Sequence, residues 1–210
     1  MIELLGTWLM AYDSGFDVLR YLTVRTIGGT LTALMLSIVL GPTLIKLLSN
    51  IQFSQSIRGD GPESHLAKSG TPTMGGLIII FSLIVSTLLW SDFKNPYIWI
   101  LIFITISFSL IGFLDDWLKI KEKNSKGLKG KYKLILQFIF ALIAMLFMLQ
   151  VSPDGNEQFF ILPFNKEYIF LISPFIFLLI SIFVIMGSSN AVNLTDGLDG
   201  LAILPAVIIA

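Results

Sequence analysis

The stretch YIWILIFITISFSLIGFLDDWLK, residues 97–119, decides the fold class of this 210-residue chain. Its first part, Tyr97–Leu114, contains no charged residue, and two adjacent carboxylates, Asp115 and Asp116, follow at once. A membrane-spanning helix needs about 20 consecutive and mostly apolar residues, because lipid offers its backbone no hydrogen-bond partner. The stretch therefore predicts a transmembrane helix that ends at a pair of acids.

Apolar runs of this kind recur along the whole chain. The other complete runs are Tyr21–Leu48, Met74–Trp90, Leu134–Val151 and Tyr168–Gly187, and a further run begins at Leu201. Charged residues make up 13% of the chain, against about 25% in soluble domains, which disfavours a soluble helical protein. We expect an all-α, polytopic integral membrane protein with five complete transmembrane helices plus the start of a sixth, in a single membrane domain over residues 1–210.

The composition excludes several other classes of function. The formal net charge is +0, so no overall basic field would attract nucleic acid, and no nucleic-acid partner is expected. Without cysteine there is no disulfide framework and no thiolate zinc site, and the single histidine, His65, cannot form a histidine cluster. The apolar N-terminal stretch lacks a basic region, which argues against a cleaved signal peptide.

The basic residues between the runs predict how the chain lies in the membrane. Short cytoplasmic loops are enriched in lysine and arginine; Asp115–Lys133 is rich in lysine, whereas Ser91–Pro96 and Ser152–Glu167 have one each. We therefore expect three polar segments on the cytoplasmic side, namely Ser49–Thr73, Asp115–Lys133 and Ser188–Gly200. The Asp-Gly turn and alternating aromatic residues of Ser152–Glu167 predict a small hairpin on the outer side.

Asp115 and Asp116 are the first candidate catalytic residues. Adjacent carboxylates repel each other, and carboxylates near the hydrocarbon region are costly, so a cation would stabilise the pair. A hard divalent ion such as Mg²⁺ binds one or two carboxylates together with substrate phosphates. The alternative is a solvated helix end, but the C-terminal end of a helix favours cations rather than acids. We therefore expect the pair to hold Mg²⁺.

A second candidate segment is SSNAVNLTDGLDGLA, residues 188–202, which lies between two apolar runs. In a helix, Asn190 and Asn193 would share a face, because residues three apart are neighbours. Asp196 and Asp199 have the same spacing, but the glycine after each indicates a broken turn. Carboxamides both donate and accept hydrogen bonds, which suits a nucleobase, a sugar or a phosphate. The alternative is a polar turn between two helices.

The third candidate segment is RGDGPESHLAKSGTPTMGG, residues 58–76. Thr71 or Thr73 could cap a helix that begins at Met74, and the helix N-terminus with Lys68 nearby could hold an anion. An ordinary loop is the alternative. Some lysines of the segment Asp115–Lys133 could also hold a diphosphate, although membrane topology and anionic lipid headgroups explain lysine there as well. Together the segments predict a membrane-level site facing the cytosol, with apolar walls suited to a lipid co-substrate.

The stretches GDGPESHLAKSGTPTMGG, IGFLDDWLK and SSNAVNLTDGLDGLA closely resemble motifs of the bacterial phospho-N-acetylmuramoyl-pentapeptide-transferases, the MraY family, and the similarity runs along the whole chain. The resemblance implies transfer of phospho-MurNAc-pentapeptide from UDP-MurNAc-pentapeptide to undecaprenyl phosphate, which forms lipid I and releases UMP. It implies a role in peptidoglycan synthesis, and so in cell-wall biogenesis, cell shape and cell division. It also implies Mg²⁺ dependence and a cytosol-facing site in the bacterial inner membrane.

The patterns and the resemblance together give roles to particular residues. Asp115 and Asp116 would be catalytic and would hold the metal: one would orient the ion or its waters, and the other would accept a proton from the lipid phosphate. The substrate-binding residues would be Lys68, Thr73, Lys131, Lys133, Asn190, Asn193, Asp196 and Asp199. The resemblance points most strongly to Lys133 for the diphosphate. It leaves the oligomeric state open, with a homodimer as one hypothesis.

The chain departs from the family in its length. Family members have about ten membrane helices, whereas this chain stops in its sixth run and lacks the family's later aspartate and histidine motifs. We therefore expect the N-terminal part of a longer enzyme, inactive alone. The alternatives are a polyprenyl-phosphate GlcNAc-1-phosphate transferase of the same superfamily, a non-catalytic membrane fragment, and a transporter. The transporter is disfavoured because the acids cluster at helix ends rather than at the membrane midplane.

Overall fold

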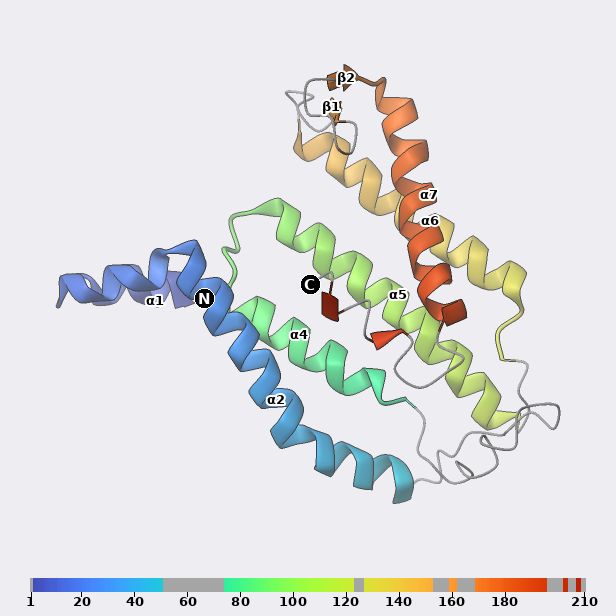
Figure 1. Ribbon diagram of the computed structural model, residues 1–210, viewed down its shortest axis with the longest axis horizontal. Coiled ribbons are helices and arrows are strands. Elements are labelled where there is room, and N and C mark those ends of the chain that lie inside the picture. The colour runs from blue at the N-terminus through green and yellow to red at the C-terminus, as the bar shows by residue number, and fades with distance from the viewer. Residues whose placement is uncertain are drawn as a thin grey trace. The chain divides into compact units, whose positions relative to one another are not determined.

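The computed structural model describes residues 2–50, 74–122, 127–152, 159–161, 169–195, 202–203 and 207–208. Its elements are α1 (Ile2–Leu9), η1 (Ser14–Arg20), α2 (Leu22–Asn50), α4 (Gly76–Trp90), α5 (Pro96–Lys121), α6 (Gly130–Val151), β1 (Phe159–Ile161), β2 (Ile169–Leu171) and α7 (Pro174–Thr195). The chain divides into two compact units, Met1–Gly130 and Lys131–Ala210, and each is described by itself. Figure 1 shows α2, α4 and α5 in the first unit and α6, the hairpin and α7 in the second.

Four of the described helices are long and apolar enough to cross a membrane: α2, α5, α6 and α7. Helix α4 has 15 residues, which extend about 22 Å, less than the ~30 Å of a bilayer core. Apolar side chains on the long helices stay exposed, for example Ile38 at 66% and Phe183 at 78%, as a lipid-facing surface requires. The helical, multi-pass class is confirmed. Five complete spans are not, and most of residues 201–210 lie outside the described part.

The start of α4 differs from its prediction. The sequence predicts a helix from Met74, but Met74 has a φ of 71° and the helix begins at Gly76. A positive φ takes a residue out of the right-handed helical region. The N-cap position is Gly75, which has no side chain to cap with. Thr71 and Thr73, the predicted capping residues, lie outside the described residues.

The last complete apolar run is also divided differently. The sequence predicts one helix over Tyr168–Gly187, but β2 occupies its beginning and α7 starts at Pro174. Proline suits the first helical position because it has no N–H to satisfy, and Ser173 Oγ accepts a hydrogen bond from the N–H of Ile176 at 3.3 Å. Strands β1 and β2 pair antiparallel. A small hairpin is thus confirmed, but it reaches beyond the predicted Ser152–Glu167.

Helices α2 and α4 pack closely at a pair of glycines. Gly28 faces the ring of Trp90, where an added Cβ would lie 2.3 Å from the nearest ring atom. Ser86 Oγ donates a hydrogen bond to the carbonyl oxygen of Gly29, and Trp90 Nε1 donates one to Thr32 Oγ1 at 2.9 Å. Membrane helices associate through small residues and interhelical hydrogen bonds, and this contact has both.

We predict that Gly28→Ala destabilises the protein and that Gly41→Ala, on the same helix, does not. The new methyl group at position 28 would meet the Trp90 ring, whereas one at position 41 would have no neighbour within 4 Å. Overpacking of this kind typically costs about 1–3 kcal/mol, and both changes raise helix propensity equally. Thermal unfolding in detergent would compare the variants. Equal Tm values would contradict the described packing.

Candidate active site

The two predicted catalytic acids lie in the last two turns of α5. The sequence predicts that they end the helix, but α5 continues past Asp115 and Asp116 to Lys121. Lys119 lies one turn further along, with its Nζ 2.7 Å from Asp115 Oδ2 and 3.0 Å from Asp116 Oδ1. Residues three and four apart are neighbours on a helix. One lysine therefore pairs with both carboxylates and reduces their repulsion within the last two turns of the helix.

The turn after α5 folds back onto Asp115. The backbone N–H of Leu128 donates a hydrogen bond to Asp115 Oδ1 at 2.8 Å. Gly127 has a φ of +55°, and an added Cβ there would lie 2.4 Å from the same oxygen, so both conformation and space require glycine. Both carboxylate oxygens of Asp115 thus have a partner. Its side chain is 17% exposed, against 35% for Asp116.

The acid pair could supply part of a metal site. Within the described ranges, no three acidic, histidine or cysteine side chains come together in a way that could hold an ion. Mg²⁺ commonly takes one or two carboxylates and completes its shell with water and substrate phosphates, so the two acids fit that donor set. An ion could reach the more exposed Asp116 first. To bind Asp115 Oδ2 it would have to displace Lys119.

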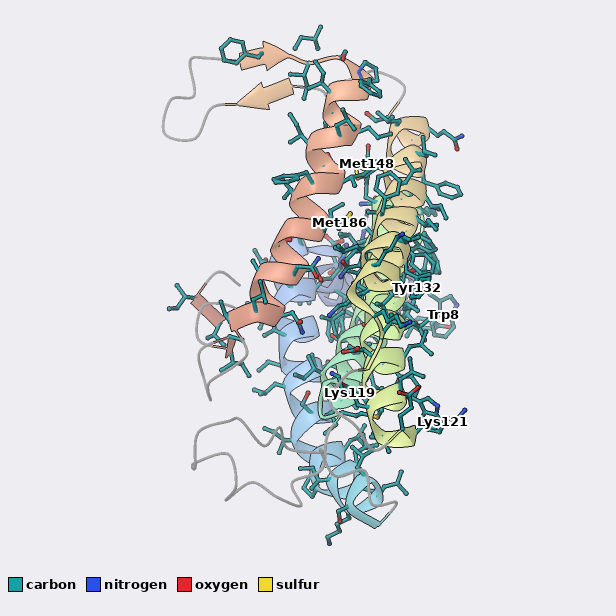
Figure 2. All side chains as sticks on the ribbon, turned by 90° about the vertical axis from the view of Figure 1, so that its right-hand side faces the viewer. Trp8, Lys119, Lys121, Tyr132, Met148 and Met186 are labelled. Atoms are coloured by element: carbon teal, nitrogen blue, oxygen red, sulfur yellow. The ribbon has the colours of Figure 1, made fainter. Side chains whose placement is uncertain are left out.

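In the second unit, two polar contacts join α6 to α7. Asn190 Nδ2 donates a hydrogen bond to Gln137 Oε1 at 2.8 Å, and Lys133 Nζ donates one to Asn193 Oδ1 at 3.3 Å. Gln137 follows Lys133 on α6, whereas its partner Asn190 precedes Asn193 on α7, so the two helices run antiparallel. Figure 2 shows the hairpin that joins them at their far end. Helix α7 extends to Thr195. The prediction that the two asparagines share a helix face is confirmed.

Two residues of these clusters, Gln137 and Lys119, were not predicted from the sequence as members of the site. Gln137 is 2% exposed and lies inside the apolar run Leu134–Val151, one turn after Lys133. A polar residue within such a run needs a partner, and this was a usable signal. Lys119 is one of several lysines in a segment predicted to be a loop, so the sequence does not single it out. Its signal is the spacing of three and four residues from the acids, which matters only if the helix continues.

The remaining predicted site residues are placed only in part. Lys68, Thr73, Asp196 and Asp199 lie outside the described residues. Lys131 is exposed in the first turn of α6, with Lys133 half-buried two residues later. The N-terminus of a helix carries partial positive charge, so two lysines there add to a field that favours anions. The acid pair belongs to the first unit, and the lysines and asparagines belong to the second.

Comparison with known families identifies the class of protein. Residues 98–210, more than half of the chain, match glycosyl transferase family 4, and the chain belongs to this family. The match includes the acid pair, Lys119 and the α6–α7 contacts.

A second match is narrower. Residues 68–80 match signature 1 of the phospho-N-acetylmuramoyl-pentapeptide-transferases, so the region is MraY-like, as the motifs predict. This signature contains Lys68 and Thr73. Taken with the long apolar helices, the two matches define a multi-pass membrane protein of the phosphosugar transferase class.

We predict an energetic coupling between Gln137 and Asn190. Asn190→Leu leaves the buried Oε1 of Gln137 without its partner, and Gln137→Leu removes one of the two acceptors of Asn190 Nδ2, the other being the carbonyl oxygen of Met186. The double change removes both side chains. Such cycles in membrane proteins average about 0.6 kcal/mol and reach about 1.7, and burial of Gln137 places this pair toward the upper value. Unfolding in detergent measures the cycle, with the more exposed Lys133–Asn193 pair as a control of smaller coupling. Additive effects at Gln137 and Asn190 would contradict the contact.

Proposed function

We propose that the protein transfers phospho-N-acetylmuramoyl-pentapeptide from UDP-MurNAc-pentapeptide to undecaprenyl phosphate, forming lipid I and releasing UMP. The match of residues 68–80 to the muramoyl-pentapeptide-transferase signature carries this proposal. The match to glycosyl transferase family 4 alone fits a second candidate equally, a polyprenyl-phosphate GlcNAc-1-phosphate transferase. The proposed reaction belongs to peptidoglycan synthesis, and so to cell-wall formation, cell shape and cell division.

The proposed site faces the cytosol in the bacterial inner membrane. The support is the lysine asymmetry of the loops, which predicts that the acid end of α5 is cytoplasmic. UDP-linked sugars are soluble in water and undecaprenyl phosphate is held in lipid, so their reaction requires a site at the membrane surface. Asp115 and Asp116 lie near the end of a long apolar helix, which suits that position.

The reaction brings two anions together. An oxygen of undecaprenyl phosphate attacks the donor phosphorus that is bonded to the sugar oxygen; a new P–O bond forms, the P–O bond to UMP breaks, and UMP leaves. Mg²⁺, when bound, would neutralise charge developing on the diphosphate, and the acid pair would hold it. One acid of the pair Asp115 and Asp116 would bind the cation, and the other would accept the proton of the lipid phosphate. A phosphate monoester has a second pKa near 6, so a weak base suffices.

The α6–α7 contacts support roles in donor binding. Lys133 would bind the diphosphate, together with Lys68, Thr73 and Lys131. Asn190 and Asn193 would contact the uridine and the sugar, with Asp196 and Asp199 completing that wall. Gln137 and the carbonyl oxygen of Met186 both accept hydrogen bonds from Asn190, and Lys133 donates one to Asn193. Their orientation therefore depends in part on α6 packing against α7. A homodimer stays a prediction, as does an aspartyl-phosphate intermediate as the alternative path.

We predict that Asp115→Asn and Asp116→Asn, made in the full-length protein, each lower kcat by orders of magnitude. Both changes remove a negative charge and a proton acceptor while keeping the side-chain shape, and general base catalysis alone contributes about 10²–10⁴-fold. Donor binding should fall much less, because the donor is held mainly by other residues. UMP release and equilibrium binding of UDP-MurNAc-pentapeptide measure the two effects. Near-normal turnover in either variant at saturating Mg²⁺ would remove that residue from the mechanism.

A further inference from the structure

Lys119 differs in its surroundings from the next lysine along α5. Its Nζ lies within 3.0 Å of one oxygen of each acid, and its side chain is 31% exposed. Lys121 follows two residues later and is exposed. Residues two apart lie on nearly opposite sides of a helix, and Figure 2 shows these two lysines on different sides of the end of α5. Of these two lysines, Lys119 alone pairs with both carboxylates.

The turn after α5 holds the same cluster from another direction. Leu128 donates its N–H to Asp115 Oδ1, while Lys119 pairs with Asp115 Oδ2. Gly127 packs against both side chains, because an added Cβ would lie 2.4 Å from the carboxylate oxygen and 2.8 Å from Lys119 Cε. Backbone and lysine therefore fix the carboxylate together, and the lysine stem has little room to move toward the turn.

We propose that Lys119 is a built-in counter-ion of the acid pair, which it holds in place until a divalent cation displaces it. The lysine and the cation need the same oxygens, and a cation beside an ammonium group at this distance is repelled. Lys119 is thus a positioning residue that lowers the affinity of the pair for the ion and keeps the binding reversible. The inference rests on the proposed function only in its expectation that a divalent cation reaches the acids.

Direct metal binding tests this inference. Mn²⁺ serves as the probe, and paramagnetic resonance of free Mn²⁺ measures its affinity for the purified full-length protein in detergent. Lys119→Met should bind Mn²⁺ at least about tenfold more tightly than the wild type, because the competing charge is gone. Lys119→Arg, which keeps the charge, and Lys121→Met, the matched control, should leave the affinity unchanged. Asp116→Asn in the Lys119→Met background should abolish the gain, which assigns the ion to the pair.

Equal or weaker Mn²⁺ binding by Lys119→Met would overturn the inference. Lys119→Gln provides a second neutral variant if the methionine variant does not fold, and it must show the same gain. UMP release by the same preparations separates this inference from the proposed function. Tighter Mn²⁺ binding in the neutral variants, without UMP release by the wild type, would refute the function alone. UMP release with unchanged Mn²⁺ affinity in those variants would refute the counter-ion alone.

Discussion

A polar group inside a membrane is stabilised by a partner within the protein, and the polar contacts between the described helices reflect that constraint. Several hydroxyl groups on the long helices bond to carbonyl oxygens one turn earlier, as Thr26 does to Leu22 at 2.9 Å and Thr105 does to Leu101 at 2.8 Å. Ser82 Oγ of α4 is an exception, since it is buried without a partner among the described residues. Between α2 and α4 the partners come from the facing helix. Side chains that cannot be satisfied so simply, the acids and carboxamides, gather in two clusters with partners of their own.

The same constraint explains how α5 carries two adjacent acids. Without Lys119 the two carboxylates would repel each other within one turn, and Asp115 would keep only the N–H of Leu128 as a described partner. With Lys119 and the N–H of Leu128 in contact, the backbone stays helical and Asp115 is held from both sides. Local pairing thus gives an acid pair that is fixed in position and only partly neutralised. A site that binds phosphates through a cation needs both properties.

The sequence predicts the helical class because long uncharged runs have one stable form in lipid. The sequence predicts helix boundaries less accurately, because a single residue can set where a helix begins. Met74, with its positive φ, moves the start of α4 to Gly76, and α7 starts at Pro174 after a strand. Asn190 and Asn193 were predictable as neighbours because helix geometry fixes their spacing. Gln137 and Lys119 carry local signals, but their partners were not predictable, since these depend on which helix faces α7 and on where α5 ends. Those facts come from packing rather than from any local pattern.

The central claim is that a membrane-embedded member of glycosyl transferase family 4 acts on the muramoyl-pentapeptide donor. The most direct test is UMP release by the full-length protein in vesicles that contain undecaprenyl phosphate and Mg²⁺, with UDP-MurNAc-pentapeptide or UDP-GlcNAc at equal concentration. We expect UMP release with the muramoyl donor and none above background with UDP-GlcNAc. Release with UDP-GlcNAc alone, or with neither donor, would contradict it.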